Sequence, residues 1–141
     1  EEQGALELRL VRAAGKPGKR YLHGQLVALR SGEGGPFHIG QVRWLLCGAD
    51  GELQAGIRLV PGAPAGVTLK PLGLNEAERS IYGLSLNPAA GTQASATLVL
   101  PAGTFKPGRT FELQGSKPRN LRLSELIERG ADFERVAFEM V

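Results

Sequence analysis

Basic side chains gather near the start of the chain, immediately before a tyrosine at position 21. Five of them fall within a short stretch: Arg9, Arg12, Lys16, Lys19 and Arg20. Guanidinium and ammonium groups beside a turn that contains glycine and proline can hold phosphate groups, and arginine can also stack on a planar base. The same charges can instead mark a solvated strand edge, where they discourage aggregation by edge pairing. We therefore treat these five side chains as candidate ligand-binding residues.

The residue types that catalysis or metal binding needs do not occur together. There is no Gly-x-Ser-x-Gly motif, and the glycine-rich segment 32–36 lacks the Lys-Ser or Lys-Thr pair of a phosphate loop. The single cysteine, Cys47, excludes an internal disulfide, and two histidines, His23 and His38, do not favour a histidine-built metal centre. We expect Cys47 to be buried by packing and both histidines to lie at the surface or the core edge. The sequence thus predicts no enzyme, no catalytic residue, no metal site and no cofactor.

The composition is that of a folded domain with a mildly basic balance. With 141 residues, the chain is long enough for one domain or two very small ones. Hydrophobic residues make up 42% and charged residues 22%, which supplies a buried core and argues against disorder. The net charge of +3 at pH 7 does not define the partner.

No apolar run reaches the roughly 20 residues that a membrane helix needs. The chain opens with Glu-Glu-Gln and shows neither the basic nor the apolar segment of a signal peptide. Together with the single cysteine, this predicts a cytoplasmic protein. Because no initiator methionine is present, we expect the chain to be a piece of a longer protein.

Glycines and prolines punctuate the chain at short intervals, and between them lie apolar or alternating runs of strand length. Leu6, Leu8 and Leu10 alternate with charged residues, which is typical of a half-buried strand. Asp50 and Gly51 form a pair that favours a tight hairpin. We expect strands over residues 6–10, 26–29, 39–46, 53–60, 67–72, 81–86, 96–100, 110–113, 121–123 and 136–140.

Many short strands at this spacing predict an all-β protein, namely a small antiparallel β-barrel with additional C-terminal strands and at most one short helix. The helix is expected over residues 124–130, because Ser124 can cap it and Gly130 can end it. Glu125 and Glu128 would then lie on its solvated face, and the other carboxylates are also expected to be solvated. Phe105, in a loop between two expected strands, is expected to fold over an open end of the barrel.

The strands form two sets, over residues 1–66 and 67–141, joined at the loose segment 61–66. The first set is expected to form a barrel half or a domain of its own. The second set is expected to supply additional strands, packed into the same barrel or an adjoining one. The sequence slightly favours a single merged fold over two.

Three of the expected strands follow a pattern that resembles a known family. Residues 24–29, 39–44 and 55–59 read Gly-Gln-Leu-Val-Ala-Leu, Ile-Gly-Gln-Val-Arg-Trp and Ala-Gly-Ile-Arg-Leu. A strand with glycine and valine, then a Gly-x-Val-x-Trp strand and then a Gly-Ile strand are similar to the second half of a PilZ domain. The resemblance covers residues 6–60. It implies a PilZ-like barrel of the family that binds the bacterial messenger cyclic di-GMP.

The PilZ family holds its ligand with an Arg-x-x-x-Arg segment before the barrel and an Asp/Asn-x-Ser-x-x-Gly motif on an early strand. The best placement of the second motif puts Val11, Ala13 and Lys16 at its three positions, and valine and alanine side chains cannot hydrogen-bond a base. No Arg-x-x-x-Arg precedes the first strand. The resemblance therefore implies a regulatory or protein-contacting module of a bacterial cyclic di-GMP signalling protein. Cyclic di-GMP stays a candidate ligand, because Arg9, Arg12 and Lys16 could still meet its phosphates.

Two alternatives remain open. The basic run from Lys16 to Arg20 in a small barrel is also typical of an RNA-binding SH3-like domain, although aromatic side chains for base stacking are few and Trp44 is expected in the core. Alternating edge strands would also suit a structural or oligomerisation domain of a larger protein. The expected partners are therefore cyclic di-GMP, another protein or another domain of the same chain, with nucleic acid less favoured.

Overall fold

The computed structural model describes residues 7–13, 20–30, 32–73, 79–91 and 93–141, and every regular element among them is a β-strand. The strands separate into two compact units. The first unit comprises residues 1–61 together with the turn Gly130–Asp132, and the second comprises Gly62–Arg129 and Phe133–Val141. The expected all-β fold class with a small antiparallel barrel is confirmed, and each expected strand overlaps an observed one.

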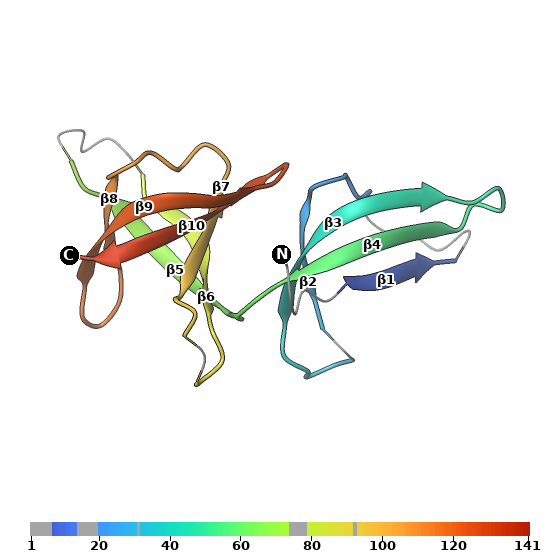
Figure 1. The fold of residues 1–141 in the computed structure, drawn as a ribbon, viewed down its shortest axis with the longest axis horizontal. Coiled ribbons are helices and arrows are strands. Elements are labelled where there is room, and N and C mark those ends of the chain that lie inside the picture. The colour runs from blue at the N-terminus through green and yellow to red at the C-terminus, as the bar shows by residue number, and fades with distance from the viewer. Residues whose placement is uncertain (1–6, 14–19, 31, 74–78, 92) are drawn as a thin grey trace. The chain divides into compact units, whose positions relative to one another are not determined.

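Four antiparallel strands form the sheet of the first unit (Figure 1). They are β1 (Glu7–Arg12), β2 (Leu26–Leu29), β3 (His38–Cys47) and β4 (Leu53–Val60), in the spatial order β1-β4-β3-β2. The expected hairpin joins β3 to β4, and Gly51 in it has a φ of 84°, a left-handed conformation that glycine adopts without steric cost. Among the described strands, β1 and β2 are each paired on one side only, so the sheet is open.

Alternation along these strands gives the sheet a largely apolar face, which we call the inner face, while Ile39 and Val60 are buried on the opposite face. Directly paired residues of an antiparallel sheet share a face, and Leu10 pairs with Ala55. The inner face includes Leu8, Leu10, Arg12, Val27, Leu29, His38, Val42, Leu45, Cys47, Leu53, Ala55, Ile57 and Leu59. Among these side chains, the buried ones are Val42, Ala55 and Ile57. This core is small, and most of the inner face stays partly exposed.

Trp44 lies on the opposite, outer face of this sheet. A register shift between Val42 and Trp44 gives β3 one residue more than β4, which is a β-bulge at Arg43. Beyond the bulge, Trp44 pairs with Gly56, and a Cβ added to Gly56 would overlap the indole ring. Trp44 is 41% exposed. The expectation of a core tryptophan is therefore wrong, because the bulge turns this side chain away from the inner face.

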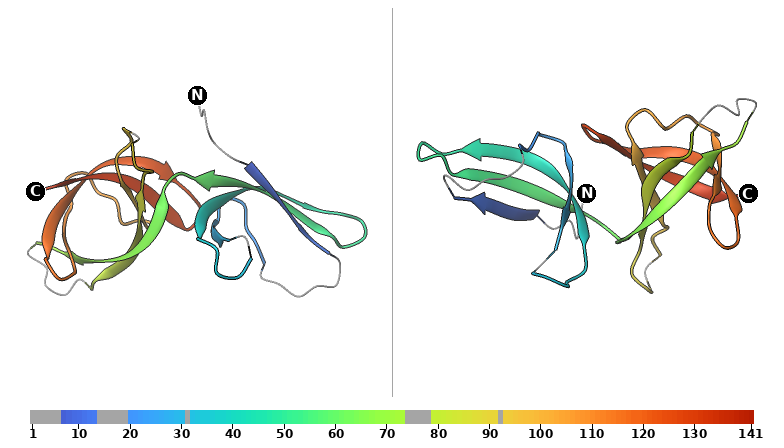
Figure 2. Two further views of the ribbon diagram at one scale, coloured as in Figure 1. Left: turned by 90° about the horizontal axis from the view of Figure 1, so that it is seen from below. Right: turned by 180° about the vertical axis from the view of Figure 1, so that it is seen from behind.

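The second unit is a closed antiparallel barrel, whose ring of strands is visible in Figure 2 (left). Its strands are β5 (Ala63–Pro71), β6 (Ile81–Asn87), β7 (Thr97–Pro101), β8 (Thr110–Leu113), β9 (Arg119–Arg129) and β10 (Phe133–Met140), in the order β10-β7-β6-β5-β8-β9. Its core includes Leu69, Leu98, Leu100, Phe111, Leu121, Leu123 and Val136. Because the ring closes, its strands pair on both sides and leave no edge open.

The helix expected over residues 124–130 is wrong, because β9 continues through them as a strand. Two register shifts against β10 leave Ser124 and Ile127 as extra residues in β9. The bulge at Ser124 returns Leu126 to the side of the strand that Leu123 occupies, and both side chains pack in the barrel core. Inward residues three positions apart imitate helical periodicity, and pairing with β10 overrides this weak local signal.

The chain first passes from the first unit to the second between Pro61 and Gly62. Gly62 has a φ of 113°, and a Cβ added there would lie 2.9 Å from the Cβ of Leu86. A side chain at this position would therefore be strained by both the backbone conformation and the lack of space. The described strands before it belong to the open sheet, and those after it belong to the closed barrel.

Candidate functional site

Three cavities lie along the inner face and the edges of the sheet in the first unit. The first, of about 190 Å³, is lined by residues that include Leu10, Val11, Arg12, Tyr21, Leu53 and Ile57. The second, of about 500 Å³, is lined by Leu10, Tyr21 and residues 25–29. The third, of about 230 Å³, is lined by Leu8, Leu10, Leu29, Arg30, His38 and Leu59. Because Leu10 lines all three, we treat them as one feature and call it the trough.

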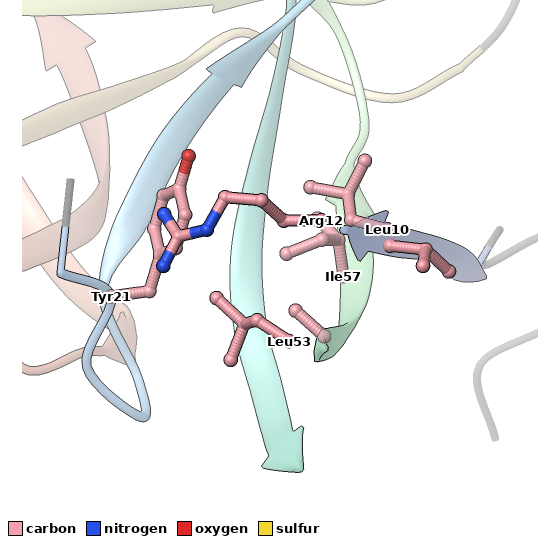
Figure 3. A pocket seen from close by; sticks show the side chains of 7 residues that line it. Leu10, Arg12, Tyr21, Leu53 and Ile57 are labelled. Atoms are coloured by element: carbon pink, nitrogen blue, oxygen red, sulfur yellow. The ribbon is translucent and has the colours of Figure 1, made fainter. Parts of the chain in front are cut away.

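At one end of the trough, Arg12 reaches toward the ring of Tyr21 (Figure 3). The guanidinium carbon Cζ lies 6.0 Å from the ring centroid, at the outer limit of cation–π attraction. Arg12 lies on the inner face because it pairs with Leu53, and Tyr21 comes from the segment before β2. A guanidinium held beside an aromatic ring and apolar side chains can receive a planar group or a carboxylate.

A second arginine–aromatic pair marks the other end of the trough. The Cζ atom of Arg30 lies 4.9 Å from the ring centroid of Phe37. Arg30 lines the third cavity together with Leu8, and Arg12 follows four residues after Leu8 on β1. Four residues of an extended strand span about 13 Å. The trough is therefore apolar along its floor and cationic at both ends.

The structure divides the predicted basic cluster. Arg9 lies on the outer face and Arg12 on the inner face, because they are three positions apart on one strand and successive side chains alternate between the faces. Arg20 is exposed, and Lys16 and Lys19 lie outside the described residues. Of the predicted site residues that the structure describes, Arg12 lies in the trough and Arg9 points away from it.

Sequence reasoning missed Arg30 and Phe37 as site residues. Arg30 directly follows β2 and Phe37 directly precedes β3, so their contact is set by the connection between two paired strands. The sequence feature that could have predicted this pair is an arginine at one end, and an aromatic residue at the other end, of the loop that connects two expected strands. Val11 and Ala13 stand where the PilZ ligand motif would have polar residues. Both are exposed, and Val11 gives the first cavity an apolar wall.

A family model matches the strands of the second unit. The model is described as the FimW C-terminal beta-barrel domain, and it matches residues 67–141, just over half of the chain. The chain belongs to this family. The match begins within β5 and runs through β10, so the trough lies outside it. No curated protein and no solved structure matches the chain.

Within the FimW C-terminal barrel, the described residues include a buried carboxylate, Glu134, which is 2% exposed. Its two oxygens accept hydrogen bonds from the amides of Phe105, at 2.8 Å, and Gly103, at 3.0 Å, and Arg129 Nε lies 3.3 Å away. Burial alone would raise the pKa of Glu134, but the two amides and Arg129 outweigh it and lower that pKa. The carboxylate ties the β7–β8 loop to β10, and Phe105 in this loop packs against the barrel core.

Two further expectations about single residues are wrong. The expectation that carboxylates are solvated fails at Glu134, whose partners come from a loop about thirty positions away in sequence and leave no local signal. Cys47 is exposed rather than buried, because it ends β3 beside the hairpin. His23 and His38 are exposed, as expected of surface histidines.

Among the residues that the structure describes, no group of three or more His, Cys, Asp or Glu side chains could hold a metal ion. Within the same residues, no helix has the length and apolar character needed to cross a membrane. The trough is therefore the feature on which a function can be argued.

Proposed function

We propose that this chain is a non-enzymatic, PilZ-like module of a bacterial cyclic di-GMP signalling protein, and that it contacts another protein through the trough. The observation that carries this proposal is the open apolar inner face. Leu8, on this face, is 43% exposed, and Leu10, two residues further along the same face, lines every cavity of the trough. A continuous apolar surface with a charged rim is typical of a protein interaction site.

The chemistry of the trough supports binding rather than catalysis. Enzyme sites place titratable groups with perturbed pKa values in a cleft. Here the described group with a resolved shift, Glu134, lies in the barrel and holds a loop. The described side chains that line the trough are mostly aliphatic, and they do not pair a nucleophile with a base.

A second candidate function is direct binding of cyclic di-GMP by Arg12 and Tyr21. The observation that favours it is the guanidinium placed beside an aromatic ring at the mouth of an apolar cavity, where a guanine could stack. RNA binding has less support, because Arg9 and Arg12 lie on opposite faces and do not form one basic surface.

Site-specific photo-crosslinking in the host cells tests the proposal. A photoreactive phenylalanine replaces Leu10 in one variant and Tyr82, which is 75% exposed on the barrel, in a matched control. We expect one discrete adduct with another protein from position 10 and none from position 82. If position 10 gives no adduct, the protein-contacting function is wrong.

Calorimetric titration with cyclic di-GMP separates the two candidates. The protein-contacting proposal expects no saturable heat in the micromolar range. Saturable binding that Arg12→Ala abolishes and Arg43→Ala preserves would replace it with the receptor function. Arg43 is a suitable control because it is exposed at the bulge of β3.

A further inference from the structure

Besides the protein contact proposed above, the trough offers a binding site for a small molecule at the end that Arg30 marks. We propose that the third cavity binds a single-chain aliphatic carboxylate, that is, a free fatty acid. The carboxylate lies on the guanidinium of Arg30, and the chain lies among the leucines of the trough. Three features carry this proposal: the lining of the cavity, the polar groups at its opening and its continuation along β2.

The lining of the third cavity divides into an apolar floor and a polar opening. It is made by four leucines, one arginine and one histidine: Leu8, Leu10, Leu29, Leu59, Arg30 and His38. The described residues of this lining include no carboxylate. Burial of an aliphatic chain against leucines is favourable, whereas a polar group buried there without a hydrogen-bonding partner would cost free energy. The cavity therefore fits a ligand with an aliphatic body and a negative charge.

Arg30 lies at the opening of this cavity, since it is exposed and also lines the cavity wall. Its Cζ atom lies over the ring of Phe37, 4.9 Å from the centroid. Arginine stacks on an aromatic ring through the flat face of its guanidinium, and the N–H donors in the guanidinium plane stay able to bind. Two of these donors can bind both oxygens of a carboxylate. Because the ring limits its rotamers, Arg30 loses less side-chain entropy when the ligand binds.

His38 supplies a second polar group at the same opening. It pairs directly with Leu29 in the register of β2 and β3, so the two side chains share the inner face. An imidazole N–H can donate a hydrogen bond to a carboxylate oxygen. The carboxylate is thus received by donors from two neighbouring positions, the residue after β2 and the first residue of β3.

The apolar floor continues beyond the third cavity. Leu10 and Leu29 also line the second cavity, so the two cavities share these walls. Together with Val27, these leucines pack against the small core of the sheet. A chain that enters beside Arg30 can therefore extend along β2 without leaving apolar surface. Each further buried methylene group strengthens binding, so the affinity should rise with the length of the chain.

Calorimetric titration with monomeric decanoate, together with NMR of the isotopically labelled chain, tests this proposal. We expect saturable binding, with shift changes at the amides of Leu10, Leu29, Arg30 and His38. Decanol has the same chain without the charge and should bind at least tenfold more weakly. Hexanoate should also bind at least tenfold more weakly, because its chain is shorter and buries less apolar surface.

Substitutions on the protein separate the two parts of the site. Arg30→Gln should weaken decanoate binding at least tenfold and leave the affinity for decanol unchanged, because the alcohol carries no charge. Arg43→Gln, at the exposed bulge of β3, is the matched control and should leave both affinities unchanged. Leu8→Gln, at a side chain that is already 43% exposed, should weaken both ligands. The fluorescence maximum of Trp44 shows that each variant keeps the folded sheet.

Several results would overturn the fatty-acid site. They are the absence of saturable decanoate binding, equal binding of decanoate and decanol, full decanoate affinity in Arg30→Gln, and shift changes confined to residues outside the trough. Vesicles of phosphatidylglycerol provide a last comparison, since a membrane surface also presents anionic heads on aliphatic chains. Binding to these vesicles without binding to monomeric decanoate would likewise overturn it. Photo-crosslinking from Leu10 tests the protein contact separately, so either proposal can fail without the other.

Discussion

The sheet of the first unit and the barrel of the second are both antiparallel, yet they bury apolar side chains to different extents. In the barrel, Phe111 and Leu123 are 0% exposed. In the sheet, Val42 is 0% exposed but Leu8, on the same face, is 43% exposed. The difference follows from closure, because the barrel strands surround their core and the open sheet covers only the middle of its inner face. Apolar side chains in a strand are therefore buried only where the neighbouring strands enclose them.

This difference assigns different physical roles to the two units. A closed ring satisfies its backbone groups and has no edge to offer, so it contributes stability. An open sheet keeps unpaired backbone and apolar surface available, and the proposed contact with another protein would use this surface. The predictions below test this contrast.

The largest effect is expected from truncating the centre of the barrel. Phe111→Ala removes a fully buried aromatic ring, over which Arg109 also lies, and should lower the free energy of unfolding by about 3–5 kcal/mol. Chemical denaturation followed by circular dichroism measures this change. Tyr82→Ala, at an exposed barrel position, should change it by less than about 0.5 kcal/mol. A loss below about 1 kcal/mol for Phe111→Ala would mean that the barrel core is not the main source of stability.

The second prediction concerns separate unfolding of the two units. Trp44 is the one tryptophan in the sequence, so its fluorescence reports on the sheet, whereas circular dichroism reports on both units. Because the sheet has the smaller core, we expect the fluorescence transition at a lower urea concentration than the transition of the barrel. Coincident transitions would show instead that the units unfold as one.

The third prediction concerns the loop that Glu134 holds. Glu134→Gln removes the charge that accepts from Gly103 and Phe105 and faces Arg129, and should cost about 1–3 kcal/mol at neutral pH. Glu139→Gln is the matched control on the same strand, because its ion pair with Arg122 is exposed and should contribute little. Equal losses in the two variants would contradict a structural role for Glu134.

The same carboxylate gives stability a defined pH dependence. Because the pKa of Glu134 is lowered in the folded state, its contribution is present above the unfolded pKa and is lost as the pH falls through the folded pKa. The wild-type chain should therefore lose more stability on acidification below pH 4.5 than Glu134→Gln does. Thermal denaturation of both proteins at matched pH values measures this difference, and parallel losses would contradict it.

The smallest effect is expected at the glycine beneath the tryptophan. Gly56→Ala places a methyl group where the Trp44 indole lies and should cost about 1–2 kcal/mol, with a red shift of the fluorescence as the ring moves into solvent. Gly66→Ala is the control, because no described atom lies within 4 Å of the added Cβ. An unchanged spectrum for Gly56→Ala would show that the indole does not need the glycine.

Local patterns predicted most of the fold. Alternation identified the strands, and the Asp50–Gly51 pair identified the hairpin, because both depend on neighbouring residues alone. The failures occur where a strand carries an extra residue. Bulges at Arg43, Ser124 and Ile127 change the phase of the alternation, and their positions depend on the partner strand.

The candidate site was predicted in part. Arg12 was predicted from its charge and from the basic residues near it in the sequence. The prediction that Arg9 belongs to the same site was made without considering that successive side chains of β1 point to opposite faces. Arg30 joins the site only because β2 folds back onto β3, which a local reading does not reveal. The first unit is an open sheet and the second is a closed barrel. This difference depends on pairing between strands that are distant in sequence, so no short segment predicts it.

The contact between Trp44 and Gly56 links two positions that ought to evolve together. A larger residue at 56 leaves no room for an indole at 44, and a small residue at 44 would uncover the backbone that the ring now shields. In related chains, loss of glycine at the second position should accompany loss of tryptophan at the first. A lineage that exchanges one without the other would have to rebuild the outside of this sheet.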